Sequence, residues 1–160
     1  MAIIGKFPGV TGECRLDGKT GYVDIASYSD GFFTPISMSG DGLSGGKTEL
    51  HSVGLTVVAG SHIPALMKNG AGGKHFATVT IEMLLQDGEQ LQKYKEITLE
   101  VAAIESNNSG DHGSSNEKGM ENLTLKVAKI TKEYFGQNDQ GQTASKGKVI
   151  IDQKAGTVTV

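Results

Sequence analysis

The feature that most constrains this chain is the alternation of apolar and polar residues in two neighbouring segments, 76–86 and 94–104. Successive side chains of a β-strand point to opposite faces of a sheet, so a period of two is typical of strands with one buried face. Between the segments, Asp87-Gly88 favours a tight hairpin turn. The two segments therefore predict paired strands, with these side chains on one face: Ala77, Val79, Ile81, Met83, Leu85, Lys95, Ile97, Leu99, Val101 and Ala103.

Further short segments show β-type patterns, and glycines lie mostly between them. They are residues 22–28, 48–58, 120–135 and a terminal hairpin of 149–152 with 157–160. Within 120–135 the apolar phase shifts by one residue after Val127, which predicts a β-bulge or a change of sheet. Short strands separated by turns favour a sandwich or a barrel. Because 160 residues is the length of one ordinary domain, we expect a mainly β domain spanning 1–160, folded as a β-barrel or as two sheets.

One segment, about residues 62–70, departs from this rhythm and predicts a short helix. Ser61 or His62 can cap its start, and Pro64 suits the first turn because its missing N–H has no helical partner there. Gly70 can adopt the left-handed conformation that ends a helix. Two turns are too short to be stable alone, so this helix must pack on the sheet.

The segment from about residue 30 to 47 predicts a long loop between two strands. Connections of this length are either functional or disordered. Disordered segments contain few apolar residues, whereas this one carries Phe32, Phe33, Ile36, Met38 and Leu43. An apolar loop that a small domain cannot fully bury indicates a partner surface.

Two glycine-lysine clusters, residues 70–75 and 46–48, resemble phosphate-binding loops only superficially. A Walker loop begins with a glycine where the first cluster has Lys68, and its lysine precedes Ser or Thr where this chain has His75. The second cluster has Asp41 at the position of that first glycine. A strand is predicted after each cluster, so no helix N-terminus faces a phosphate. Neither cluster predicts nucleotide binding.

Catalytic and metal-binding patterns are missing from the sequence. The four histidines show no ligand spacing, and the single cysteine, Cys14, permits no internal disulfide. No strand–turn–helix carries a nucleophile elbow. We expect Glu82, Glu96 and Glu100 to be solvated or paired with lysines across strands. The prediction is a non-enzymatic protein without metal or cofactor.

Charge and hydropathy exclude two further classes of partner. The net charge is −3 and the lysines are scattered, so the basic stripe of a nucleic-acid-binding protein is absent. No apolar run approaches the roughly 18 residues of a membrane-spanning helix. The first residues also lack the pattern of a cleaved signal peptide. We expect synthesis in the cytoplasm and, if the protein is exported, a route without a cleaved signal.

Several stretches of the chain resemble the Hcp (haemolysin-coregulated protein) family of bacterial type VI secretion. They are residues 9–14, the segment Tyr22–Gly31, the helix start at 63–67 with Gly73-Lys74-His75-Phe76, and residues 121–130. The resemblance runs over nearly the whole length.

The resemblance implies a β-barrel with a short helix, assembled as a homohexameric ring. It implies that rings stack into a tube that a contractile sheath propels, that a spike protein caps the tube, and that small effector proteins ride in the ring. Candidate subunit-interface residues are Phe32, Phe33, Ile36, Met38, Leu43 and Lys74. The alternative is a small β-barrel ligand-binding module or hydrolase that uses the Lys74–His75 corner.

Overall fold

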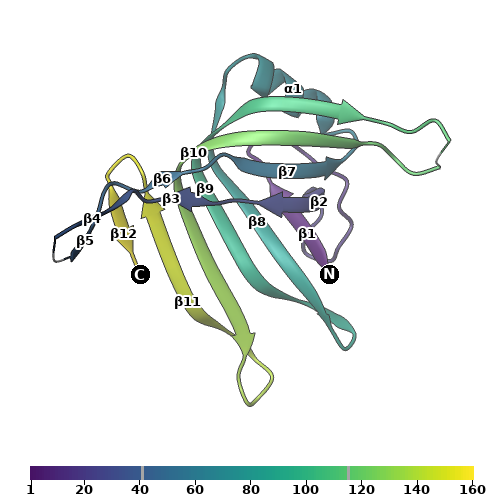
Figure 1. Ribbon diagram of the computed structural model, residues 1–160. Coiled ribbons are helices and arrows are strands. Elements are labelled where there is room, and N and C mark those ends of the chain that lie inside the picture. The colour runs from purple at the N-terminus through teal and green to yellow at the C-terminus, as the bar shows by residue number, and fades with distance from the viewer. Residues whose placement is uncertain (41, 115) are drawn as a thin grey trace.

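The computed structural model describes residues 1–40, 42–114 and 116–160, so Asp41 and Ser115 lie outside the described residues. The fold is mainly β with one short helix (Figure 1). The strands and the helix are β1 (Ala2–Lys6), β2 (Val23–Ser29), β3 (Phe32–Phe33), β4 (Ile36–Ser39), β5 (Gly42–Gly45), β6 (Glu49–Leu50), β7 (Val53–Val58), α1 (Ile63–Ala71), β8 (His75–Asp87), β9 (Gln90–Gly110), β10 (Met120–Gln137), β11 (Thr143–Asp152) and β12 (Thr157–Thr159).

The large antiparallel sheet curls round until its strand pairings run in a cycle. The cycle passes from β1 to β2, β7, β10, β9, β8 and back to β1. Its interior is filled by branched aliphatic side chains, among them Leu55, Ile81, Leu99 and Leu123, and α1 adds the fully buried Leu66. The predicted barrel-like, mainly β architecture is confirmed.

The lower part of the sheet continues beyond this barrel. The β8–β9 and β10–β11 hairpins extend downwards together in Figure 1, and β11 and β12 form the side of the sheet beyond β10. Strand β10 pairs with β7 over Met120–Leu125 and with β11 over Lys129–Gln137. The apolar phase shift after Val127 falls at this change of partner, but both partners belong to one sheet. The register shifts of β10 lie at Thr124/Leu125 and Tyr134/Phe135, so the predicted bulge or change of sheet at this point is wrong.

Strand boundaries agree with the sequence prediction better than side-chain directions do. The polar, glycine-containing segment from about 105 to 119 favours a loop, but strand β9 runs on to Gly110, so residues 105–110 belong to the strand. The first residues of the chain, which lack the pattern of a signal peptide, form β1, a strand that the sequence analysis did not predict. His51 lies within the predicted strand 48–58, but it is exposed and precedes β7.

The predicted burial of Val101 and Ala103 is wrong. Val101 has a φ of 53° and its side chain is 53% exposed. This left-handed residue interrupts the alternation, and Ala102 and Ile104 face the core instead. A β-branched residue in this conformation is a genuine outlier, because its Cβ approaches the following carbonyl oxygen.

Val101→Asn is expected to stabilise the fold by about 1 kcal/mol, because asparagine tolerates left-handed backbone at less cost. For a chain of this size, that corresponds to a rise in melting temperature of about 2–4 °C. Val101→Ala is the matched control, since it removes the branched methyl groups but keeps a Cβ at positive φ. Calorimetric scans of the three proteins test this, and equal gains from Asn and Ala would contradict it.

The short helix is confirmed, but its ends differ from the prediction. Its N-cap His62 is buried and makes no capping hydrogen bond through its side chain. The chain passes through Gly70 in helical conformation, and the helix ends at Ala71. The left-handed residue is Gly73, with a φ of 66°, which turns the chain into β8.

Among the described residues, no helix combines the length and apolarity needed to cross a membrane.

Candidate functional site

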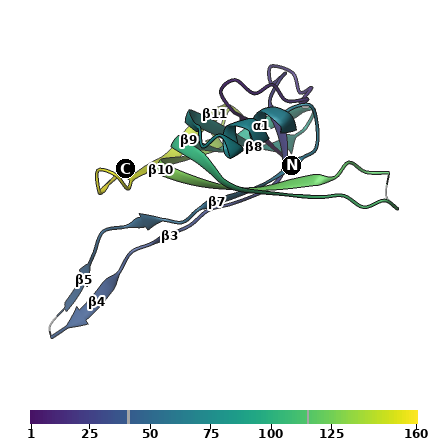
Figure 2. The same cartoon turned by 90° about the horizontal axis from the view of Figure 1, so that it is seen from above.

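The segment expected to be a long loop is a projecting arm built from paired strands. At its base, β3 pairs with β6, and further out β4 pairs with β5. The side chains of Thr34 and Thr48 share a 2.8 Å hydrogen bond between these two pairs. Figure 2 shows this arm, the segment from Phe32 to Leu50, extending away from the barrel on the side opposite the β9–β10 hairpin.

The outer part of the arm has one apolar and one polar face. Met38 pairs with Leu43 across the two strands, and Ile36 lies two residues before Met38 on the same face. On the other face, the hydroxyl groups of Ser37 and Ser44 share a 2.8 Å hydrogen bond. Ile36, Met38 and Leu43 are 65%, 83% and 69% exposed. The described chain thus leaves an apolar stripe uncovered far from its own core.

The base of the arm is apolar as well and is anchored by a polar network. Phe32 and Phe33 are both exposed. Beside them, the Tyr28 hydroxyl donates to Asp30 at 2.7 Å, and Lys132 Nζ donates to the other carboxylate oxygen at 2.7 Å. Burial, and then the hydrogen bond to Asp30, raise the pKa of the Tyr28 hydroxyl far above its usual value. This network fixes the direction in which the arm leaves β2.

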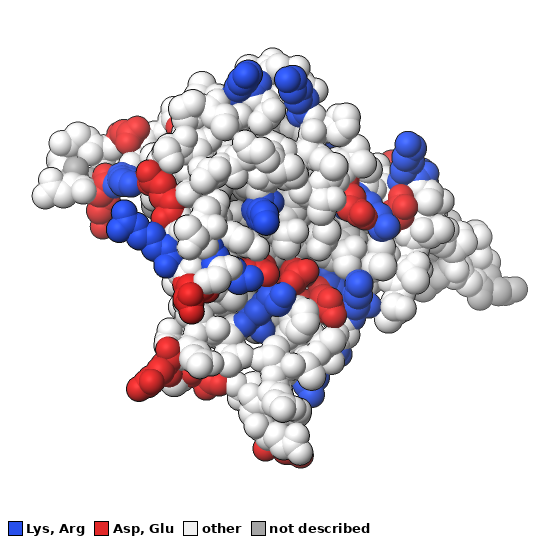
Figure 3. Space-filling model, turned by 180° about the vertical axis from the view of Figure 1, so that it is seen from behind, with Lys and Arg blue, Asp and Glu red and all other residues white. Residues whose placement is uncertain are grey.

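Charged side chains gather across the middle of the rear face of the molecule (Figure 3), the polar side of the sheet. Among the charged side chains of the sheet, Glu82, Glu96 and Glu133 are directly opposite one another on β8, β9 and β10. Lys93 Nζ lies 3.5 Å from Glu82 and also binds Glu96. Lys19 Nζ approaches Glu82 Oε2 to 2.7 Å, as an ionic contact whose angle is poor for a hydrogen bond.

Glu82 is only 4% exposed, which is unusual for a carboxylate. The expected pairing of these glutamates with lysines is confirmed, and Glu100 likewise pairs with Lys129 at 3.1 Å. Burial alone lowers the pKa of Lys93, but the hydrogen bond and charge of Glu96, with Glu82, outweigh it, so that pKa is raised. Lys93 therefore remains cationic beside the buried carboxylate.

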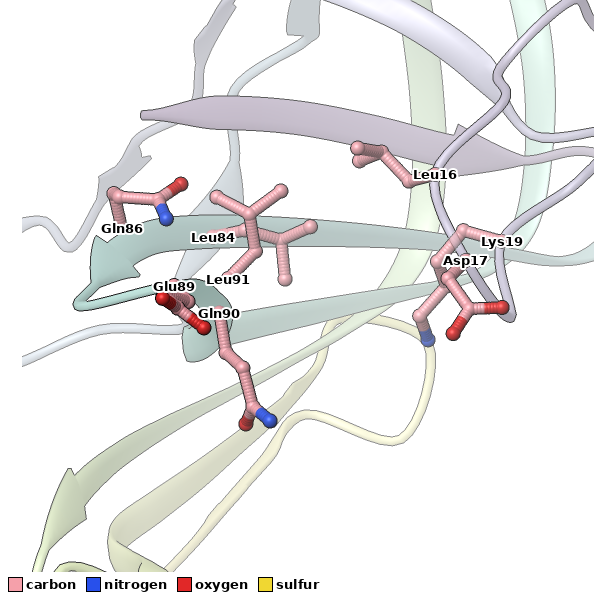
Figure 4. A pocket seen from close by; sticks show the side chains of 8 residues that line it. All are labelled: Leu16, Asp17, Lys19, Leu84, Gln86, Glu89, Gln90 and Leu91. Atoms are coloured by element: carbon pink, nitrogen blue, oxygen red, sulfur yellow. The ribbon is translucent and has the colours of Figure 1, made fainter.

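A cavity of about 580 Å³ lies beside this cluster, between the β1–β2 connection and the β8–β9 turn (Figure 4). Its floor is formed by Leu16, Leu84 and Leu91. Asp17 stands on one side of the floor and Glu89 on the other. We call these five residues the acidic pocket. Sequence reasoning missed it, because its two walls are more than 60 residues apart in the chain.

The Lys74–His75 corner is open to solvent. Both side chains are exposed, and neither lines the 580 Å³ cavity. The backbone N–H of Lys74 donates to the carbonyl of Asn69. Helix α1 precedes this cluster and a strand follows each glycine-lysine cluster, as expected. Within the described residues, no three His, Cys, Asp or Glu side chains are placed to hold a metal ion.

The candidate interface residues from the sequence fall into two groups. Phe32, Phe33, Ile36, Met38 and Leu43 all lie exposed on the arm, whereas Lys74 lies apart from them after α1. The amphipathic character of the outer arm was not predicted, although Ile-Ser-Met-Ser at residues 36–39 already alternates. The many glycines around this stretch are typical of a loop, so the alternation was not recognised as a strand pattern.

Three solved structures share this fold over nearly their whole length. "Structure of a type six secretion system protein" superposes with a TM-score of 0.89 and 19% identity, covering 99% of each chain. Hcp1 from Salmonella typhimurium has a TM-score of 0.78 and 20% identity, covering 99% of this chain and 98% of that one. A type VI secretion system effector from Yersinia pestis has a TM-score of 0.69 and 14% identity, covering 94% and 98%.

Comparison by sequence gives the family. No curated protein sequence matches the chain. The family model described as "Type VI secretion system effector, Hcp" matches residues 5–134, which is most of the chain. The chain therefore belongs to the Hcp family of type VI secretion system tube proteins, which are secreted structural components of that system and not enzymes.

Proposed function

We propose that this chain, acting as one domain, is the repeating subunit of a homohexameric ring, and that such rings stack into the inner tube of the secretion system. The observation that carries the proposal is the uncovered apolar stripe of the arm, Ile36, Met38 and Leu43. Apolar patches that a chain leaves exposed mark surfaces for other proteins. Family membership makes a second copy of this chain the natural partner.

The arm gives the contact a direction. The arm projects from one side of the barrel. Its apolar stripe would therefore contact a surface of the next copy that differs from the arm itself. Such head-to-tail contacts close into rings or continue along an axis. Met38, the most exposed of the three, has a flexible side chain that adapts to a partner surface. The arm is our candidate for contacts between stacked rings or between neighbours in a ring.

The remaining partners follow from the family alone. The assembled tube would lie in the cytoplasm, surrounded by a contractile sheath and capped by a spike protein, and small effectors would travel in the ring lumen. Export of the tube with its cargo would need no cleaved signal.

The wild-type protein is expected to form ring-shaped hexamers. Negative-stain electron microscopy of the purified chain and sedimentation velocity between about 5 and about 500 µM test this. That range of concentrations detects association with a dissociation constant of about 10⁻⁵ M. A sedimentation coefficient that stays at the monomer value over the whole range would contradict the proposal.

A further inference from the structure

We propose that neighbouring subunits of the ring are joined by a basic edge on one copy, which docks on the acidic pocket of the next. The basic edge consists of Lys146 and Lys148 on β11. This inference rests on the ring proposed above and names the two surfaces that would close it.

The acidic pocket is built to receive an amphipathic cation. Its leucine floor offers apolar contact, and the side chains of Asp17 and Glu89 have no hydrogen-bond or ion-pair partner among the described residues. Its one lysine, Lys19, is already held by the buried Glu82. The pocket therefore presents uncompensated negative charge around an apolar centre.

The basic edge is the unpaired side of the sheet. Strand β11 pairs with β10 along its length but with β12 only over Ile150–Asp152, so the outer backbone of 143–149 has no strand partner in the described chain. Lys146 and Lys148 are exposed and form no ion pair among the described residues.

The edge also contains a device that limits indiscriminate pairing. Between Tyr134 and Phe135 the register of β10 against β11 shifts, which leaves Lys146 as the extra residue of a β-bulge. Bulges and lysines on an edge strand discourage pairing with arbitrary strands. An acidic partner surface compensates the charge of the lysines, so pairing with it is not disfavoured. The same lysines therefore favour one partner over others.

The basic edge lies on β11, and the acidic pocket lies between the β1–β2 connection and the β8–β9 hairpin, with β10 between β11 and β9 (Figure 1). Among the described residues, no hydrogen bond or ion pair joins Lys146 or Lys148 to Asp17 or Glu89. Because the two surfaces are different and complementary in charge, a second copy is the occupant that satisfies both, and repetition of the contact closes a ring when its rotation allows.

Charge reversal tests this joint. The variant K146E/K148E has an acidic edge and an acidic pocket, and D17K/E89K has a basic edge and a basic pocket. Each alone is expected to weaken assembly at least 30-fold, because like charges then face one another. The control K68E/K126E carries the same charge change as the first variant on exposed lysines elsewhere and should assemble like the wild type.

Mixing the two variants gives the decisive result. In a one-to-one mixture, each edge meets a pocket of opposite charge, so alternating rings should form that neither variant forms alone. Sedimentation and electron microscopy report this directly. Two variants that fail alone and do not recover in the mixture would overturn the pairing of these surfaces.

Salt dependence of the wild type provides a test that needs no variant to fold. Raising NaCl from 0.1 to 1 M shortens the screening length from about 10 to about 3 Å, so ring formation should weaken. Rings that still form at 1 M NaCl and in both charge-reversal variants would refute the contact between the basic edge and the acidic pocket, but would leave the proposed tube function unaffected. A wild-type protein that stays monomeric would refute the function itself.

Discussion

Replacing Ile36, Met38 and Leu43 together by serine is expected to yield a folded chain that assembles about 1,000-fold more weakly than the wild type. Each apolar side chain that becomes buried in a contact is worth about 1.5 kcal/mol or more, so three account for about 4 kcal/mol. The residues touch no part of the barrel core, so the melting temperature of the monomer should not change. Sedimentation equilibrium and thermal scans measure the two quantities separately.

The opposite face of the arm supplies the matched control. The triple variant S37A/S39A/S44A changes as many residues on the same two strands but leaves the apolar stripe intact. It should assemble within about threefold of the wild type, since exposed surface changes cost little. Deleting residues 34–45 should reproduce the assembly defect of the serine variant. Undiminished assembly by the deletion variant would remove the arm from the proposal.

The sequence predicts the strands of this fold because hydrophobic alternation reports one buried face directly. Strand β8 and the β11–β12 hairpin were placed within a few residues, apart from the first half of β11. That first half, 143–148, is exposed on an edge and has no apolar alternation to detect. Where a strand has no buried face, its backbone pairing produces no alternation of apolar residues that could be detected in the sequence.

Local departures from regular strand geometry were also beyond the sequence. The burial of Ala102 and Ile104 follows one left-handed residue, Val101, and valine is a residue type from which that conformation is not expected. Apolar residues on the arm marked a candidate surface, but its hairpin register and the acidic pocket come from contacts between distant segments.

The second large effect concerns the buried Glu82. Changing both Lys19 and Lys93 to methionine is expected to destabilise the fold by about 3–5 kcal/mol near pH 7, because a buried carboxylate then loses both of its partners. Methionine keeps most of the aliphatic stem of lysine, so packing is largely preserved. Urea unfolding followed by circular dichroism measures the loss.

The companion variant separates lost charge pairing from lost packing. Adding Glu82→Leu to the double substitution replaces the whole ion cluster by apolar side chains of similar size, and most of the stability should return. If the triple variant is as unstable as the double one, the lysine stems and not the unpaired carboxylate carry the effect.

Because Lys19 ties the β1–β2 connection to β8, the double variant should also disturb the wall of the acidic pocket and weaken assembly, while the triple variant should recover both stability and assembly. Recovery of stability without recovery of assembly would show that the negative charge of Glu82, and not only the position of that wall, contributes to the contact between subunits.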